Sequence, residues 1–400
     1  LALLLAVAIM VTMCACAKEN KSTEMTTEAA TMETTGSEES TSGEATAEKT
    51  TEETTEGTKP LNIMMYVIQS LGTLSCEDLI YEQLQRFCKE TGSTLNYYEC
   101  NSDETKHDTT LPELCASGKY DVIVTGYYSI PEPVQRAAEM YPDQKWILFD
   151  CSVDYSLPYC KNIASFTADQ NTLAFMAGAL AALMTTETSD PHINADKVVG
   201  WVGGGENTAV NDFLVGYIDG VNYVDPSIEV LYSYIGDWAN SAKGTELANA
   251  QFDLGADVVF AVAGGAGFGV CEAAASKGHY AFGVDTDFGA QLKQSGSATA
   301  DYVVSSAIKQ FGDIVYDAMV KFYNGELEFG KHTSCDVTSG YLEMLETDQF
   351  NKIVKEGMPE AYKRYTEICQ DLRDGKIEVG TAVGATPEYV TEKKAEAAAH

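Results

Sequence analysis

Two acidic positions follow directly after short apolar runs that are typical of β-strands. Asp150 follows residues 145–149, and Asp285, with Asp287 close behind it, follows residues 280–284. Carboxylates at strand ends can accept paired hydrogen bonds from a polyol, and charged acceptors make the stronger hydrogen bonds. Capping of a turn or a helix is the competing interpretation for each acid. The pattern favours a hydroxyl-bearing ligand.

Aromatic side chains near predicted strand ends or loops could hold a flat ring between them. The candidates are Tyr127, Tyr128, Phe213 and Trp238. Because the chain contains 22 tyrosines, packing in the core is the competing role for each of them.

Two glycine clusters each end a predicted strand and precede a predicted helix. Gly264 and Gly265 open the run that ends at Gly269, and Gly203 opens the other cluster. Free backbone N–H groups and the helix dipole can bind ligand oxygens at such a place. The dinucleotide fingerprint fails because Val270 stands at its third glycine position. A ligand loop and a tight strand-to-helix turn remain alternatives.

Signatures of catalysis and of metal binding are mostly absent from the sequence. The five histidines lack the spacing of a zinc protease motif, and no cysteine pair has the CxxC spacing. There is no phosphate-binding loop of the G-x-x-x-x-G-K-[ST] type, so the chain is not its own ATPase. Nine cysteines remain beyond residue 16, and we interpret them as small buried apolar side chains with at most one or two disulfides. We expect no cofactor, no metal and no catalytic residues.

The start of the chain resembles a bacterial lipoprotein signal. Residues 1–13 are nearly all apolar and too short to span a bilayer securely, and they run into Cys14 and Cys16. Cys16 fits lipidation better because Ala15 precedes it, whereas the bulky Met13 precedes Cys14. An ordinary signal peptide is the alternative. We therefore predict a signal over residues 1–16.

Residues 17–59 consist mainly of Thr, Glu, Ser and Ala and cannot bury enough apolar surface to fold, so we predict a disordered tether. Its eleven Glu and four Lys leave about -27 of the formal net charge of -34 on the remainder. A chain this acidic, without a local basic stripe, is repelled by phosphate backbones, so nucleic acid is excluded as a partner.

After Pro60, short apolar runs alternate with amphipathic stretches, which predicts βαβ units and mainly parallel sheets. The α/β pattern occurs twice, which predicts two Rossmann-like lobes joined by a hinge, with strand ends lining one cleft. The first lobe is predicted to comprise 60–166 and about 290–327, the second about 167–289 and 328–380, and 381–400 a tail. The predicted strands are 61–68, 94–99, 120–125, 145–149, 162–167, 197–202, 228–235, 257–263, 280–284 and 333–344. Helices are predicted at 76–91, 132–141, 171–185, 207–223, 242–254, 267–277 and 350–375, and a strand followed by a long helix over 297–324.

A series of motifs between residues 60 and 380 resembles one known family. They include Tyr141-Pro142-Asp143-Gln144-Lys145, Asn162-Ile163-Ala164-Ser165-Phe166-Thr167, Val199-Gly200-Trp201-Val202-Gly203-Gly204, Gly255-Ala256-Asp257, Gly283-Val284-Asp285-Thr286-Asp287 and Asp374-Gly375-Lys376-Ile377. Together they resemble the basic membrane protein family of lipoproteins, of the purine nucleoside receptor type.

This resemblance implies a type I periplasmic-binding-protein fold and a lipoprotein that captures nucleosides for an ABC importer. It further implies that Asp285 and Lys309 hold the ribose hydroxyls, that the loop at Gly264 and Gly265 approaches the ligand, and that Phe213 stacks on the base. The lysine also fits the chemistry by itself, since an ammonium donor beside a carboxylate acceptor can grip neighbouring hydroxyls.

The loop after the first strand departs from the family pattern. The family has D-x-S-F-N there, and this chain has Thr73-Leu74-Ser75-Cys76-Glu77, so Ser75 alone is kept. The missing phenylalanine would supply one stacking face, worth about 1 to 3 kcal/mol in other base-binding sites. Tyr127, Tyr128 or Trp238 could substitute for it.

We therefore expect a non-enzymatic binding lipoprotein, anchored by Cys16 on the outer face of a bacterial, Gram-positive cell membrane. Its expected partners are a nucleoside, which the resemblance implies to be a purine one, and a membrane ABC permease. A riboflavin-like compound or a sugar is the alternative ligand. An α/β enzyme acting on a ribosyl compound, and a repressor effector domain, are alternatives of other classes.

Overall fold

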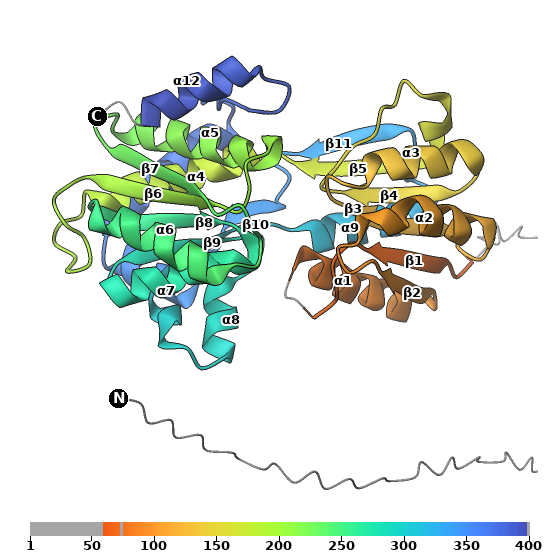
Figure 1. Cartoon of the computed structure of the whole chain (residues 1–400), viewed down its shortest axis with the longest axis horizontal. Coiled ribbons are helices and arrows are strands. Elements are labelled where there is room, and N and C mark those ends of the chain that lie inside the picture. Colours follow the sequence, from red (N-terminus) through yellow and green to blue (C-terminus); the bar gives the residue numbers. More distant parts are fainter. Residues whose placement is uncertain (1–58, 73–74, 398–400) are drawn as a thin grey trace, which may run out of the picture. The chain divides into compact units, whose positions relative to one another are not determined.

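The computed structural model describes residues 59–72 and 75–397, which contain two six-stranded β-sheets (Figure 1). The first sheet has the order β11-β5-β4-β3-β1-β2 and the second β12-β10-β9-β8-β6-β7. All pairings are parallel except that of β12 with β10. We call the first sheet with its helices lobe 1 and the second lobe 2. The predicted α/β class with two Rossmann-like lobes is confirmed.

Lobe 1 has helices on both faces of its sheet because β1 alternates its side chains between two cores. Ile63 and Met65 pack with α1 and α9, whereas Met64 and Tyr66 pack with α2 and α3. Both faces of β1 are therefore buried, as in parallel sheets generally. The elements of lobe 1 are β1 (Asn62–Val67), α1 (Cys76–Thr91), β2 (Thr94–Glu99), α2 (His107–Ala116), β3 (Val122–Gly126), α3 (Pro131–Met140), β4 (Lys145–Phe149), β5 (Ile163–Ala168), α9 (Phe311–Tyr323) and β11 (Lys331–Cys335).

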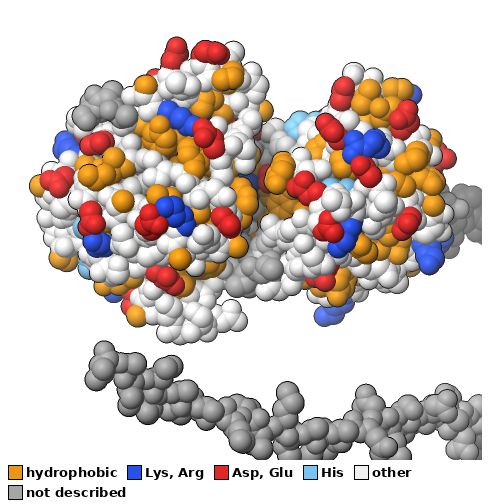
Figure 2. Space-filling model, in the orientation of Figure 1, with side chains coloured by type: hydrophobic (Ala, Val, Ile, Leu, Met, Phe, Trp, Pro, Cys, Tyr) orange, Lys and Arg blue, Asp and Glu red, His pale blue; other side chains and the backbone are white. Residues whose placement is uncertain are grey.

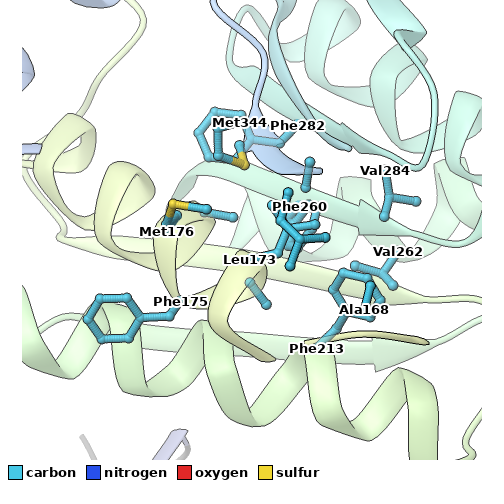
Figure 3. Packing of buried hydrophobic residues seen from close by; sticks show 14 of the residues in the cluster. Ala168, Leu173, Phe175, Met176, Phe213, Phe260, Val262, Phe282, Val284 and Met344 are labelled. Atoms are coloured by element: carbon cyan, nitrogen blue, oxygen red, sulfur yellow. The ribbon is translucent and has the colours of Figure 1, made fainter. Parts of the chain in front are cut away.

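Lobe 2 is built in the same way. Helix α4 (Gln170–Thr185) covers one face of the sheet, where Leu173 and Met176 meet Phe260 and Phe282 (Figure 3), and α6 and α7 cover the other. The other elements are α5 (Thr208–Val224), α6 (Ser241–Asp253), α7 (Gly267–Lys277), α8 (Phe288–Gln294), α10 (Asp348–Phe350), α11 (Pro359–Arg373), α12 (Pro387–Ala397), and the strands β6 (Val198–Gly203), β7 (Glu229–Tyr234), β8 (Ala256–Val262), β9 (Tyr280–Val284), β10 (Val303–Lys309) and β12 (Leu342–Met344).

Helices α4 and α5 touch backbone to backbone. A Cβ atom on Gly216 would lie 2.0 Å from the carbonyl oxygen of Asn171, and one on Gly178 would lie 2.1 Å from that of Tyr217. Glycine is therefore required at both positions. The close approach fixes α5, which carries Phe213 toward the carboxyl ends of the strands.

The last third of the chain crosses between the lobes at points that the sequence did not predict. The sequence predicts residues 290–327 in lobe 1, but strand β10 pairs with β9 in lobe 2. Of that range, α9 packs on α1 of lobe 1. Strand β11 pairs with β5 in lobe 1, although 328–380 were assigned to lobe 2. The predicted strand 333–344 is thus two strands in different sheets. Hydrophobic period does not reveal which sheet edge a strand joins.

The C-terminal segments also need correction. The predicted helix over 350–375 is divided into α10, a π-helical turn over Asn351–Glu356, and α11, which starts at Pro359 because proline disfavours helix in the residue before it. The predicted tail over 381–400 contains α12, with residues 398–400 outside the described part. The predicted signal over 1–16, with Cys14 and Cys16, and the tether to residue 58 also lie outside it.

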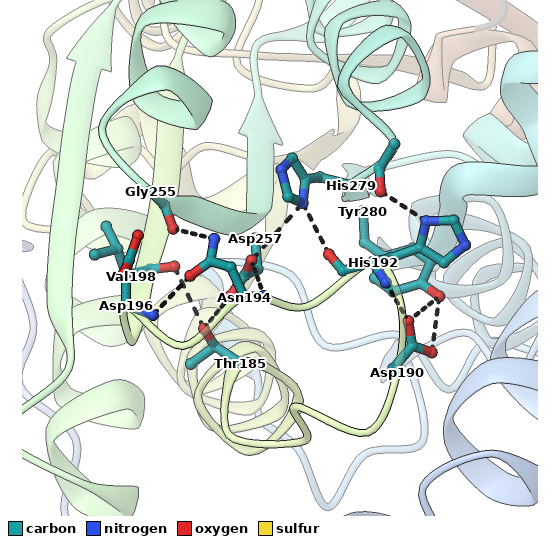
Figure 4. A network of polar contacts seen from close by, with 11 residues as sticks. Thr185, Asp190, His192, Asn194, Asp196, Val198, Gly255, Asp257, His279 and Tyr280 are labelled. Atoms are coloured by element: carbon teal, nitrogen blue, oxygen red, sulfur yellow. Dashed lines mark hydrogen bonds and ion pairs between the residues drawn. The ribbon is translucent and has the colours of Figure 1, made fainter.

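The histidines of the described residues have structural partners. In lobe 2, His192 Nδ1 lies 2.7 Å from the Gly278 carbonyl oxygen, and His279 Nδ1 lies 2.8 Å from that of His192 (Figure 4). The carboxylate of Asp257 accepts from Thr185 and from the Asn194 N–H nearby. This network lies where β8 and β9 begin, at the opposite strand ends from Asp285.

Most cysteines of the described residues are buried, as the sequence predicts. The nine cysteines of the described residues are free thiols, and eight are buried, as expected of small apolar side chains. On the face shown in Figure 2, Lys and Arg are scattered among Asp and Glu and form no continuous basic stripe. Among the described residues no helix is long and apolar enough to cross a bilayer.

Candidate ligand-binding site

Three predicted site residues stand directly after parallel strands in a left-handed backbone conformation. The φ angles are 72° for Tyr127 after β3, 53° for Asp150 after β4 and 63° for Asp285 after β9. Three further non-glycine residues of the described part have positive φ. Such conformations are strained, most of all for a bulky tyrosine, and they cluster at functional sites. The left-handed conformation sets the direction of these three side chains at the carboxyl ends of the strands, where ligands bind in open α/β sheets.

Lys309 at the end of β10 joins the two acids. Its Nζ lies 3.4 Å from Oδ1 of Asp150 in lobe 1 and 3.4 Å from Oδ1 of Asp285 in lobe 2. The lysine side chain is 6% exposed, against 25% for Asp150 and 40% for Asp285. The three residues, which we call the ionic triad, therefore connect the lobes, and Asp285 is their most accessible member.

Lys309 is positively charged in the triad because the attraction of the two carboxylates outweighs the effect of burial on its pKa. Burial lowers the pKa of Lys309, but Asp150 and Asp285 raise it more, so the ammonium stays charged at neutral pH. Burial raises the pKa of Asp150, the neighbouring ammonium of Lys309 lowers it, and the negative charge of Asp285 raises it. The net result is a pKa above the ordinary value of an aspartate. An ammonium between two carboxylates presents both donors and acceptors to a ligand's hydroxyls.

Aromatic rings enclose the lysine ammonium. Nζ lies 5.3 Å from the ring centroid of Phe213 and 5.4 Å from that of Phe311, within cation–π range. Phe311 packs on Phe149 at 6.2 Å, and Phe149 on Tyr127 at 5.4 Å between centroids. The structure thus brings Phe213 and Tyr127 to the triad.

The N-terminus of α1 places the thiol of Cys76 beside Tyr127, next to the triad. The Tyr127 hydroxyl lies 3.0 Å from Sγ of Cys76. Burial raises the pKa of Cys76, the bond to Tyr127 lowers it, and the nearby Asp285 and Asp150 raise it further, so the thiol is neutral. Ser75 is the N-cap residue of α1, and its N–H donates to Asp78. The residue that departs from the family's phenylalanine therefore forms part of the site, and Ser75 begins the helix that carries it.

Glu77 is a structural residue of this region that the sequence analysis missed. It is fully buried, and its two oxygens accept from the N–H groups of Ile68 at 2.7 Å and Gln69 at 3.0 Å. An acid in a helix's first turn is common and gives no sign of burial. Burial raises the pKa of Glu77 to about 7, although the two backbone donors oppose the change.

We expect this carboxyl to make the protein more stable in mild acid. Its folded-state pKa of about 7 exceeds the ordinary 4.5, so this contribution is present below pH 4.5 and is lost as pH rises through 7. The loss amounts to at most about 3 kcal/mol. Glu77→Gln should remove it, so the free energy of unfolding in urea should fall less between pH 5 and pH 8 than in the wild type.

The exposed Glu82 on the same helix provides the control. Glu82→Gln should follow the wild-type pH curve. Glu77→Gln should also be about 1 to 3 kcal/mol less stable at pH 5, because its amide N–H₂ faces a backbone donor. Parallel pH curves for wild type and Glu77→Gln would contradict the assignment.

Trp238 and the two glycine loops form a second cluster at the strand ends of lobe 2. The Trp238 carbonyl accepts from Ala266 N–H at 2.9 Å, and a Cβ on Gly204 would lie 2.5 Å from its ring. Gly264 has φ of 53°, and a Cβ there would lie 3.8 Å from the Trp238 ring, whereas a Cβ on Gly265 would lie 3.4 Å from the Trp238 carbonyl oxygen. The indole, 44% exposed, therefore rests on both loops and has surface free for a ligand.

Tyr128, a further candidate, lies apart from both clusters. Tyr128 is 75% exposed and its hydroxyl donates to Glu104 at 3.4 Å, away from the triad's contacts. Within residues 59–72 and 75–397 no group of His, Cys, Asp and Glu side chains could hold a metal ion. The arrangement offers hydrogen bonds and ring contacts.

Two α/β lobes with donors and acceptors at their strand ends have the fold of type I periplasmic binding proteins. The chain belongs to the family described as ABC transporter substrate-binding protein PnrA-like, whose model matches residues 61–371. It is therefore a substrate-binding protein of an ABC transporter and not an enzyme.

Similar proteins agree with this assignment. The ABC transporter nucleoside-binding protein BmpA of Lactococcus lactis is 27% identical over 313 residues, 75% of this chain and 83% of that protein. Basic membrane protein D of Borreliella burgdorferi is 29% identical over 61% of this chain and 66% of its own length. A solute-binding protein structure from Aeropyrum pernix superposes with a TM-score of 0.71 at 21% identity, covering 84% of this chain and 98% of that one.

Proposed function

We propose that this chain captures a nucleoside, a purine one in the first instance, between its lobes and delivers it to an ABC importer. The observation that carries the proposal is the ionic triad, in which Lys309 stands between strand-end carboxylates of both lobes beside the ring of Phe213. Asp285 and Lys309 would grip the ribose hydroxyls, and Asp150 would add an acceptor from the other lobe. The nucleoside-binding relative from Lactococcus supports this ligand class.

The base would stack on aromatic side chains that differ from the family pattern. Phe213 supplies one ring, and Trp238, exposed over the loops of Gly264 and Gly265, supplies another. Cys76 stands where the family has phenylalanine, so Trp238 takes over that stacking face in the proposal.

Ligand capture would shift the lobes from an open to a closed arrangement that docks on the permease. The proposal places the protein on the outer face of the cell membrane, held by a lipid on Cys16. A relative from Pyrococcus horikoshii is described as a lipoprotein, which supports the anchor.

The proposal is tested with residues 57–400, which form one compact unit. Thermal unfolding is followed with adenosine, inosine, guanosine, cytidine, uridine, adenine, ribose, riboflavin and galactose, because a ligand that binds the folded state raises Tm with its concentration. We expect ribonucleosides to raise Tm more than adenine or ribose at equal concentration. Trp238→Ala should weaken adenosine about tenfold in calorimetry and ribose little, since stacking is worth about 1 to 3 kcal/mol.

Stabilisation by compounds without a ribosyl group alone would refute the nucleoside assignment. A response to riboflavin or galactose but not to nucleosides would favour the alternative ligands. The solvent-exposed Tyr128 provides the matched control, and Tyr128→Ala should leave adenosine affinity unchanged.

A further inference from the structure

Residues 380–397 lie beyond the segment that the family model matches and end in helix α12. This helix packs on α5 and on β7, the edge strand of the lobe 2 sheet (Figure 1). This role is not predicted by the sequence, because the segment is short, polar and rich in alanine. We call residues 380–397 the strap.

The strap is attached to α5 by two acids of that helix. Asp212 is buried and accepts from the Thr381 hydroxyl at 2.6 Å and the Ala382 N–H at 2.7 Å. Asp219 accepts from Lys393 Nζ at 2.7 Å and, through its other oxygen, from a strap N–H. The strap thus helps to bury Asp212 and also supplies two hydrogen bonds to its carboxylate, and hydrogen bonds to charged groups are the stronger ones. The attachment is thus specific.

A third attachment holds the loop before α5. Lys394 Nζ lies 2.5 Å from Oε1 of Glu206, and its side chain is 15% exposed. The ammonium also lies over the rings of Tyr234 and Tyr232, at 4.8 and 5.9 Å from their centroids. The Lys394 ammonium is thus enclosed by the two rings, whereas the Glu206 side chain is 63% exposed, so water screens the pair in part.

The segment that the strap holds also carries the ligand-site residues. Phe213 follows Asp212 on α5, and its ring faces the Lys309 ammonium. Glu206 comes directly after the glycine loop on which the Trp238 ring packs. In that loop the Gly204 carbonyl accepts a hydrogen bond from the Asp237 N–H at 3.0 Å. Residues 203–213 are therefore held by the strap and also touch the proposed ligand cleft.

We infer that the strap is a positioning element of the ligand site and that Lys394, through Glu206, fixes residues 203–213 so that Phe213 and Trp238 stand ready to stack. This inference rests on the proposed function for its ligand. The lysine touches no ligand itself. Its effect on binding should therefore depend on the rings that it positions.

Amide hydrogen exchange tests the inference without any ligand. In Lys394→Met, whose side chain keeps most of the apolar stem, exchange over residues 203–213 should be at least about threefold faster than in wild type, because the segment opens more often. Lys394→Arg should restore slow exchange. Glu392→Gln, an exposed charge change on the same helix, is the matched control and should match wild type.

Calorimetry with adenosine gives the second readout. Lys394→Met should weaken binding about three- to tenfold, and the same change in a Phe213→Ala background should add much less, as expected of coupled residues. If Lys394 only stabilised the fold, Lys394→Met would lower Tm, and its effect on adenosine affinity would be the same with and without Phe213.

The outcomes separate this inference from the proposed function. Wild-type exchange over residues 203–213 in Lys394→Met would overturn the inference, and so would additive losses in the Phe213→Ala background. If wild-type protein binds neither adenosine nor any other nucleoside, the proposed function fails, and the exchange experiment still decides whether the strap fixes this segment.

Discussion

Replacing Lys309 by methionine is expected to lower adenosine affinity at least a thousandfold, or about 4 kcal/mol. The substitution keeps the apolar stem but removes the ammonium that lies 3.4 Å from both Asp150 and Asp285. Two carboxylates are then left to repel each other and the ligand loses its charged donor, and removing one partner of a hydrogen-bonded charge pair costs about 2 to 5 kcal/mol in binding. Calorimetry on residues 57–400 measures the loss.

The same variant should lose more stability than the wild type does as pH rises. Lys309 lowers the pKa of Asp150, which burial already raises above its ordinary value, so without the lysine this pKa rises further. A folded-state pKa above the unfolded value gives stability that is lost as pH rises. Urea unfolding should therefore show the variant closest to wild type near pH 5 and furthest from it near pH 8.

Lys331 provides the control for charge removal, since its pair with Glu328 is exposed at the surface. Lys331→Met should change neither adenosine affinity nor the pH profile, and its effect on stability should stay within about 0.5 kcal/mol. Adenosine binding by Lys309→Met within threefold of wild type would remove the triad from the site.

The acids of the site could be placed from the sequence because their strands could. Strands β4 and β9 have the predicted bounds, since each is a continuous apolar run that stops at an aspartate. The sequence thus located Asp150 and Asp285 at strand ends. Their left-handed φ angles could not be predicted, because they depend on how each chain leaves its sheet.

Lys309 could be connected to these acids from the sequence only through the family resemblance. Its place follows from β10 pairing with β9 in lobe 2, and the hydrophobic pattern assigned that strand to lobe 1. Sheet membership is decided by packing of segments far apart in the chain, which local periodicity does not record.

Glu77 and the strap were missed for the same physical reason. Glu77 is buried because the turn after β1 folds its N–H groups onto it, and α12 is held because Asp219, far earlier in the chain, meets Lys393. In each case the sequence predicts a solvent-exposed charged residue. Its structural role comes from a partner that only the tertiary structure brings close to it.

Asp285→Asn is expected to lower adenosine affinity at least a hundredfold, or about 3 kcal/mol, with little change in Tm. Asparagine tolerates the left-handed backbone that Asp285 adopts at φ of 63°, so the turn after β9 should persist. What is lost is the negative charge and one of two acceptor oxygens. Alanine would add backbone strain at this φ, so asparagine isolates the effect on binding.

The exposure of Asp285 explains why binding should suffer more than stability. Its side chain is 40% exposed, so a ligand can reach it, whereas the ammonium of Lys309 keeps Asp150 as a second partner. Asp348, 93% exposed on α10, provides the matched control, and Asp348→Asn should bind as wild type. Since adenine lacks ribose, any affinity for it should be the same in Asp285→Asn and wild type. A variant that bound adenosine and adenine with equal relative loss would show that Asp285 shapes the whole site, whereas selective loss of adenosine would assign the ribose hydroxyls to this carboxylate.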